Sequence, residues 1–131
     1  MDVINVIVAG LASFAFGAVW YSVFATAWKD ASGVALDAEA NPANQKSPVP
    51  YVTAVVASII VAGMMRHVFE LSAIDTVGKS IQSGLGIGAF LAAPWLATNY
   101  GFAGRPFKLL LIDGGYATFG CGIIGLVLAL F

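Results

Sequence analysis

Four apolar stretches take up most of this 131-residue chain, and each is long enough to cross a lipid bilayer. The hydrocarbon core of a bilayer is about 30 Å thick, so a helix that rises about 1.5 Å per residue needs about 20 apolar residues to span it. The segments between the stretches are too short and too polar to build a soluble domain. We therefore predict an all-α fold: a polytopic membrane protein in which one domain, residues 1–131, forms a four-helix transmembrane bundle. The expected spans are residues 3–27, 51–71, 81–100 and 107–131, and a polar loop at 28–50 joins the first two.

Composition agrees with a bilayer setting and excludes several classes of function. Hydrophobic residues make up 60% of the chain and charged residues 10%, and the mean hydropathy of +0.90 is far from that of a soluble domain. The formal net charge is −1, and no basic run is present that could hold nucleic acid. Cys121 is the single cysteine, which excludes an intrachain disulfide and a multi-cysteine metal site. We expect it to be a small packed side chain, and we expect no metal and no cofactor.

The first stretch is predicted to be a retained span. Met1-Asp2-Val3 carries an acid and no base, whereas a signal peptide begins with basic residues. The apolar run is also longer than the roughly 7–15 residues of a signal-peptide core.

The basic residues predict an orientation for the bundle. Four of them flank the first and third loops and two flank the second, so we expect loops 28–50 and 101–106 in the cytoplasm. The four are Lys29, Lys46, Arg105 and Lys108, and the two are Arg66 and Lys79.

Small residues recur at four-residue spacing in several of the stretches. Lipid tails are as apolar as leucine, so helices in a bilayer associate through close packing at small residues. These rows predict tight helix contacts at Gly84 and Gly88 in the third stretch, and at Gly114, Gly115 and Gly122 in the fourth. They do not say whether the partner helix belongs to the same chain.

Asp113 lies well inside the fourth predicted span. Counted from Pro106 it is about 10 Å into the helix, where an ionised carboxylate is costly, by about 2.5–3.5 kcal/mol at mid-bilayer and less near the surface. We expect it to face the bundle interior and to be paired or protonated. A proton- or ligand-binding acid and a purely structural link between spans both fit this position. Candidate partners at the same membrane level are Tyr21, Asn99, Tyr100, Arg105 and Lys108.

Arg66, His67 and Glu70 form a second candidate cluster near the opposite membrane surface. Arg66 and Glu70 are four residues apart and can pair along one helical face. His67 is the single histidine, so a metal or haem site would lack partners of its own type. We interpret the cluster as an interfacial salt bridge with an adjacent histidine.

Three segments together carry a resemblance to a known family. They are GAVWYS at 17–22, NYGF at 99–102 and GRPFKLLLIDGGY at 104–116. The chain resembles, over nearly its full length, the bacterial membrane proteins grouped as domain of unknown function 1761. The resemblance implies a four-span protein of the bacterial cytoplasmic (inner) membrane and supplies no activity. Members often carry a bulky residue after the acid, so Gly114-Gly115 predicts an unusually close helix contact in this chain.

No nucleophile–base pair, phosphate loop or metal-ligand spacing is present in the sequence, so we predict a non-enzyme. The leading hypothesis is a small membrane protein that works through helix contacts in the bilayer, as a homo-oligomer or as an accessory subunit of a larger membrane complex. The alternative is a small oligomeric transporter or channel in which Asp113 binds a proton or a cation. The expected partners are the lipid bilayer and either a second copy or other integral membrane proteins, without nucleic acid.

Overall fold

The computed structural model describes residues 3–131, and within them it is helical without a β-strand. Four helices are long and apolar enough to cross a membrane: α1, α3, the continuous rod from α4 to α5, and α6. The predicted all-α fold with four membrane-length helices is therefore confirmed. The elements are α1 (Val3–Val23), α2 (Ala25–Ser32), α3 (Val49–Leu71), α4 (Val77–Ile87), the π-helical segment η1 (Gly88–Ala92), α5 (Ala93–Phe102) and α6 (Phe107–Ala129).

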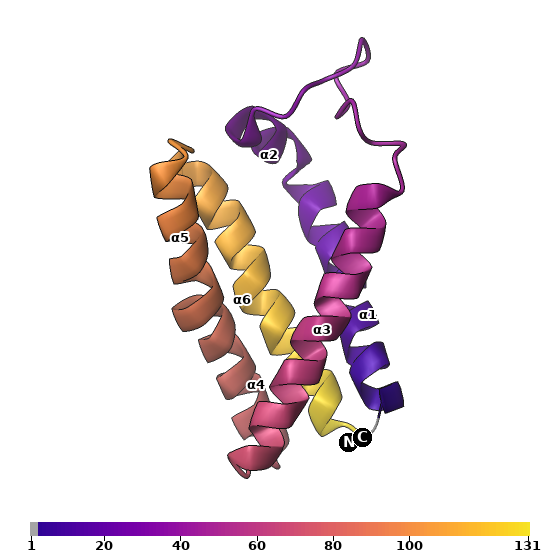
Figure 1. The fold of residues 1–131 in the computed structure, drawn as a ribbon, viewed down its shortest axis with the longest axis vertical. Coiled ribbons are helices and arrows are strands. Elements are labelled where there is room, and N and C mark those ends of the chain that lie inside the picture. Colours follow the sequence, from indigo (N-terminus) through magenta and orange to yellow (C-terminus); the bar gives the residue numbers. More distant parts are fainter. Residues whose placement is uncertain (1–2) are drawn as a thin grey trace.

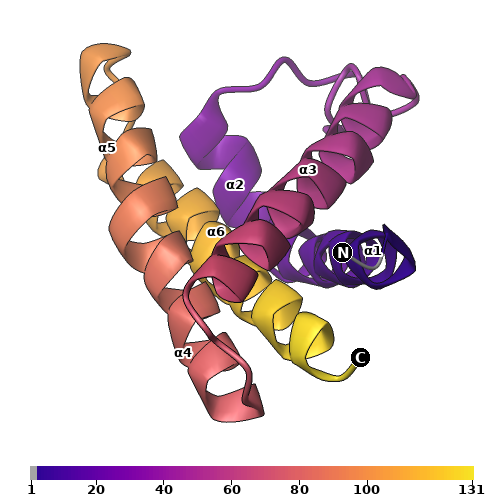
Figure 2. The same ribbon diagram turned by 60° about the horizontal axis from the view of Figure 1, so that its bottom comes forward.

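Helix α6 is the centre of the bundle. It contacts every other helix, while α3 packs mainly on α1 (Figure 1). In Figure 2, α3 passes across α6 toward the start of α4. The buried core accordingly draws its side chains from α1, α3 and α6: Val6, Ala9, Ala62, Met65, Phe69, Cys121, Ile124 and Leu128.

The contact between α4 and α6 depends on glycine. A Cβ atom built on Gly84 would lie 2.4 Å from the carbonyl oxygen of Cys121, and one on Gly88 would lie 2.3 Å from the Cα of Thr118. From the other side, a Cβ on Gly125 would lie 2.2 Å from the carbonyl oxygen of Ser80. Backbone meets backbone along this interface, which is the packing mode expected of helices in lipid.

The outward faces of the bundle are apolar. On α3, Val52, Val56, Ile60 and Met64 follow one another at four-residue spacing, and each is at least half exposed. Phe90, in η1, is 84% exposed. Continuous apolar surface of this kind is unusual on a soluble monomer and fits contact with lipid. The chain is thus a multi-pass membrane protein by the length, composition and outward faces of its helices.

The first span ends earlier than residue 27, and the segment at 28–50 is not all loop. Helix α1 stops at Val23, the chain bends at Phe24, and the separate helix α2 contains Trp28 and ends at Ser32. The sequence of α2 mixes apolar with charged residues, so it suits the membrane surface better than the hydrocarbon core. Gly33 closes α2 in the left-handed conformation, with φ of 66°, which glycine adopts without strain.

Proline accounts for the start of α3 and for a π-helical turn inside the third span. Helix α3 begins at Val49, with Pro50 in its first turn, where the missing N–H group has no helical partner to lose. The third span runs continuously over Val77–Phe102 and contains η1 just before Pro94. Pro94 cannot donate to the preceding turn, and the N–H of Ala93 reaches back five residues to the carbonyl of Gly88.

The two ends of the bundle carry different loops. The polar loop after α2 and the turn between α5 and α6 share one end, while the α3–α4 link and the last turn of α6 share the other (Figure 1). This separates the two candidate clusters, because Asp113 lies toward the first end and Arg66 toward the second.

Candidate intramembrane polar site

Asp113 lies in the second turn of α6 and receives hydrogen bonds from two other spans. The hydroxyl of Tyr21, near the end of α1, donates to Oδ1 at 2.7 Å. The hydroxyl of Tyr100, near the end of α5, donates to Oδ2 at 2.5 Å. All three residues are half-buried. Each carboxylate oxygen therefore has its own tyrosine donor, and three spans meet at one acidic group.

Aromatic rings pack around Tyr21 and against the neighbouring turn of α6. The ring of Tyr21 lies edge-on to that of Tyr116, with centroids 5.4 Å apart, and edge-on to that of Trp28 of α2 at 6.2 Å. The indole nitrogen of Trp20 donates to the carbonyl of Ile112 at 3.0 Å. The tyrosine that binds the acid is thus part of an aromatic cluster drawn from α1, α2 and α6.

Three of the candidate partners do not bind the acid. Asn99 and Lys108 are exposed, and within residues 3–131 neither of them hydrogen-bonds to Asp113. Neighbouring residues differ by about 100° around a helix, so Asn99 and Tyr100 share a height but cannot share a face. Arg105 turns to the loop instead, where its guanidinium donates to the carbonyl of Ser32 at the end of α2.

The glycines next to the acid have different neighbours. A Cβ on Gly115 would lie 2.7 Å from the Trp20 ring, so the close contact expected there is made with an indole and not with a backbone. A Cβ on Gly114 would be 3.5 Å from the Cβ of Ala93, which is ordinary contact. Gly122, further along α6, makes room for the side chain of Leu85.

The site has the chemistry of a single acid held by neutral donors. Within residues 3–131, Asp113 has no ion pair, because the two salt bridges there are Arg66–Glu70 and Asp75–Lys79. The same residues contain no group of three His, Cys, Asp or Glu side chains that could hold a metal ion. The arrangement can exchange a proton or attract one small cation.

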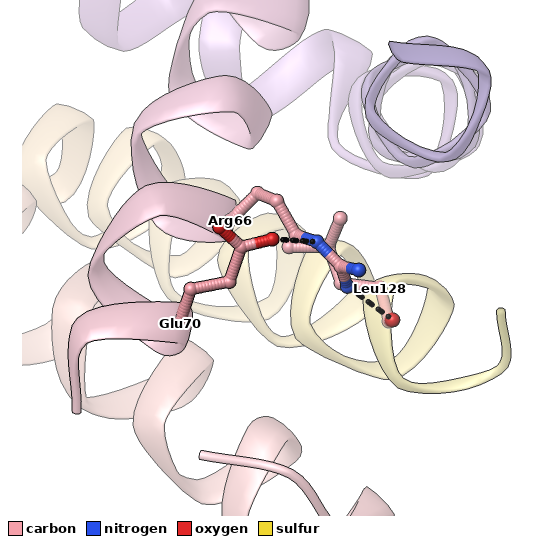
Figure 3. A network of polar contacts seen from close by, with 3 residues as sticks. All are labelled: Arg66, Glu70 and Leu128. Atoms are coloured by element: carbon pink, nitrogen blue, oxygen red, sulfur yellow. Dashed lines mark hydrogen bonds and ion pairs between the residues drawn. The ribbon is translucent and has the colours of Figure 1, made fainter. Parts of the chain in front are cut away.

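In the second candidate cluster, Arg66 and Glu70 interact but His67 does not join them. Arg66 Nε donates to Glu70 Oε1 at 3.1 Å, and Arg66 Nη1 donates to the carbonyl of Leu128 at 3.2 Å, so the guanidinium joins α3 to the end of α6 (Figure 3). His67 is exposed and takes part in neither bond. The spacing of Arg66 and Glu70 predicts their pairing, but a backbone acceptor on another helix leaves no signal in the sequence.

Sequence reasoning missed the roles of Trp20 and Tyr116. From the sequence, Trp20 has no assigned part in the site, yet its indole nitrogen donates to a carbonyl of α6 and so ties α1 to α6. Tyr116 donates to the carbonyl of Ser13 at 3.3 Å, and a Cβ on Gly17 would lie 2.9 Å from its ring. The sequence does contain glycines in the same spans as large aromatic residues, but it does not specify which ring packs against which glycine.

The sequence matches the family described as "Protein of unknown function (DUF1761)" over residues 4–129. The chain belongs to the DUF1761 family. No curated protein matches this DUF1761 chain. No solved structure matches it either. The family match covers all four membrane-length helices and both tyrosines of the site, and it brings no activity with it.

Proposed function

We propose that this protein is a non-enzymatic membrane protein whose functional centre is the Asp113 carboxylate, which takes up a proton or a monovalent cation. The observation that supports this proposal is an intramembrane acid held by two tyrosine hydroxyls from two other spans. Ionisable groups inside membrane spans are costly and usually mark ion or substrate sites.

The identity of the two donors favours uptake of a proton. An arginine or lysine partner would keep the acid ionised through an ion pair. A tyrosine hydroxyl both donates and accepts, so it can hydrogen-bond to the carboxylate and, after proton uptake, accept from the carboxylic O–H. Tyr21 and Tyr100 can therefore hold Asp113 in both protonation states without moving far.

A pathway for protons or cations across the membrane would require more than one protomer. Four short helices centred on α6 barely enclose a route through a bilayer, and α6 itself fills the centre. We infer that transport through this site takes place in an oligomer.

A second candidate function is assembly alone, with the protein acting as a homo-oligomer or as an accessory subunit of a larger membrane complex. The glycine rows that motivated it from sequence are used inside the chain, between α4 and α6. An assembly surface would therefore use the exposed apolar face of α3 or the exposed aromatics Phe90, Trp95 and Phe102. We place the protein in the bacterial cytoplasmic membrane, with the α2 end in the cytoplasm on the balance of basic residues.

Ion flux in proteoliposomes tests the leading proposal. Wild-type protein should acidify or load vesicles when a membrane potential is imposed with H⁺, Na⁺ or K⁺ as the permeant cation. Asp113→Asn keeps the size and one acceptor of the side chain but cannot ionise, so the flux should fall to that of empty vesicles. Asp30→Asn, which changes an exposed acid of α2 that belongs to neither candidate cluster, is the matched control and should leave flux unchanged.

Chemical crosslinking in native membranes separates the two candidates. An oligomer whose flux is the same for wild type and Asp113→Asn would support assembly alone and would exclude the carboxylate as the functional centre. A strictly monomeric protein without partners contradicts both.

A further inference from the structure

A pocket lies at the end of the bundle opposite Asp113. Its volume is about 300 Å³, it is open on one side, and it is lined by the end of α3, the α3–α4 link, the start of α4 and the end of α6. Since these helices end there, the pocket is at the membrane surface. Its walls combine apolar Phe69, Ile74, Leu128 and Phe131 with charged Arg66, Glu70 and Asp75.

The positive charge in this pocket is fixed in place. The side chain of Arg66 is 23% exposed and is held at one end by Glu70 and at the other by the carbonyl of Leu128 (Figure 3). A guanidinium has five N–H donors. These two bonds use two of them, so three remain without a hydrogen bond within residues 3–131.

The negative charges remain accessible. The Glu70 side chain is 47% exposed, and Arg66 contacts only one of its two carboxylate oxygens. The Asp75 side chain is 72% exposed and pairs loosely with Lys79 at 3.6 Å. Both carboxylates can accept further hydrogen bonds from a ligand in the pocket.

The mixture of charges selects the class of ligand. A simple cation would meet the guanidinium, and a simple anion would meet two carboxylates. A ligand with an anionic and a cationic group satisfies both, and the apolar walls at the membrane surface suit one that also carries hydrocarbon. We propose that this pocket binds the headgroup of a zwitterionic phospholipid with a primary ammonium group. Its phosphate accepts from Arg66, its ammonium donates to Glu70 and Asp75, and its acyl chains follow the apolar wall.

Competitive lipid retention tests this site. Delipidated protein in detergent is mixed with equal amounts of phosphatidylethanolamine, phosphatidylcholine and phosphatidylglycerol of identical acyl chains, and bound lipid is counted by native mass spectrometry. Phosphatidylethanolamine should be retained in about tenfold preference, the effect of one charge-assisted hydrogen bond. Equal retention of the three lipids, or a preference for phosphatidylglycerol, overturns the proposal.

Two variants locate the site, and a third controls for general effects. Arg66→Gln should lower phosphatidylethanolamine retention about tenfold by removing the phosphate donor. Glu70→Gln changes an exposed side chain, so this variant should keep its fold even if Arg66→Gln unfolds. Its preference for phosphatidylethanolamine over phosphatidylglycerol should disappear. Arg105→Gln is the matched control, because Arg105 also binds a backbone carbonyl but at the opposite end, and it should behave as wild type.

Two results would contradict the assignment. Equal loss of lipid in Arg105→Gln and Arg66→Gln would show a nonspecific charge effect. Displacement of the bound lipid by an equal concentration of soluble phosphoethanolamine would assign the pocket to a soluble ligand instead of a lipid. Neither outcome depends on Asp113, so this proposal stands or fails separately from the proposed function.

Discussion

Replacing Gly84 with alanine should force α4 away from α6, because the interface has no room for a methyl group. The new Cβ would lie 2.4 Å from the carbonyl oxygen of Cys121, whereas ordinary contact begins at 3.4 Å, so about 1 Å of extra separation is needed. The obstructing atom is backbone, and a backbone cannot move aside as a flexible side chain can. Gly86 is the matched control on the same helix, since a Cβ there meets nothing within 4 Å.

The magnitude follows from the cost of overpacking. Extra methyl groups in a well-packed interior typically cost about 1–3 kcal/mol, which corresponds to a change of about 5- to 150-fold in the unfolding equilibrium constant. The Gly84→Ala cost should be in the upper half of that range, because Gly88 and Gly125 keep the same interface tight on either side. Gly86→Ala should be neutral or more stable by up to about 1 kcal/mol, since alanine is the better helix former.

Reversible unfolding in mixed micelles, followed by circular dichroism, measures the two changes side by side. We expect a lower unfolding midpoint for Gly84→Ala and an unchanged or higher midpoint for Gly86→Ala. If both alanine variants were as stable as wild type, the close approach of α4 and α6 described above would be refuted. Equal destabilisation by both would point instead to a general intolerance of α4 toward alanine.

Three other changes give separate predictions. Asp113→Leu should lower the thermal midpoint in detergent, since both tyrosine hydroxyls lose their acceptor at about 1–3 kcal/mol each, and a midpoint that rises would place the acid on the lipid face. Tyr100→Phe removes one donor to the carboxylate and should cost about 1.5–3 kcal/mol by the same assay, whereas Tyr51→Phe, whose exposed hydroxyl binds a loop carbonyl, should change stability by less than about 0.5 kcal/mol. Gly33→Ala places a side chain at φ of 66° and should cost about 1 kcal/mol, visible as faster amide exchange at the end of α2; unchanged exchange would contradict the left-handed cap.

The spans could be predicted from the sequence because the bilayer imposes a minimum length on every apolar helix. The bend at Phe24 could not, because the residues on both sides of it are compatible with a helix and the chain remains apolar through Ala25. Pro94 marks a disturbance in the third span, but the sequence does not specify that a π-helical turn resolves it. The thickness of the bilayer sets the minimum length of each helix, but it does not determine where a helix bends or contains a π-helical turn.

The sequence predicts the membrane depth of the residues near the site, but not which of their side chains face α6. Residues that flank the first and third loops must stand near the Asp113 level, which includes Tyr21 and Tyr100 together with Asn99 and Lys108. Rotation around each helix axis decides which of them face α6, and adjacent residues differ by about 100°. The glycine rows have the same limitation. They indicate which face of a helix packs closely. Which helix packs on that face depends on the arrangement of all four spans, and for Gly84 and Gly88 it is α6.

The position of the two polar centres along α6 limits how they can act. Asp113 and Leu128 are 15 residues apart, which is about 22 Å of helix and most of the thickness of a bilayer. Between them α6 is locked against α4 by close backbone contact at Cys121 and Gly125. No single small ligand can reach both centres, and their separation along the bundle is fixed because Asp113 and Leu128 belong to the same continuous helix. The two proposed sites therefore lie at different depths: the carboxylate lies toward the α2 end of the bundle, and the Arg66 pocket lies at the opposite end.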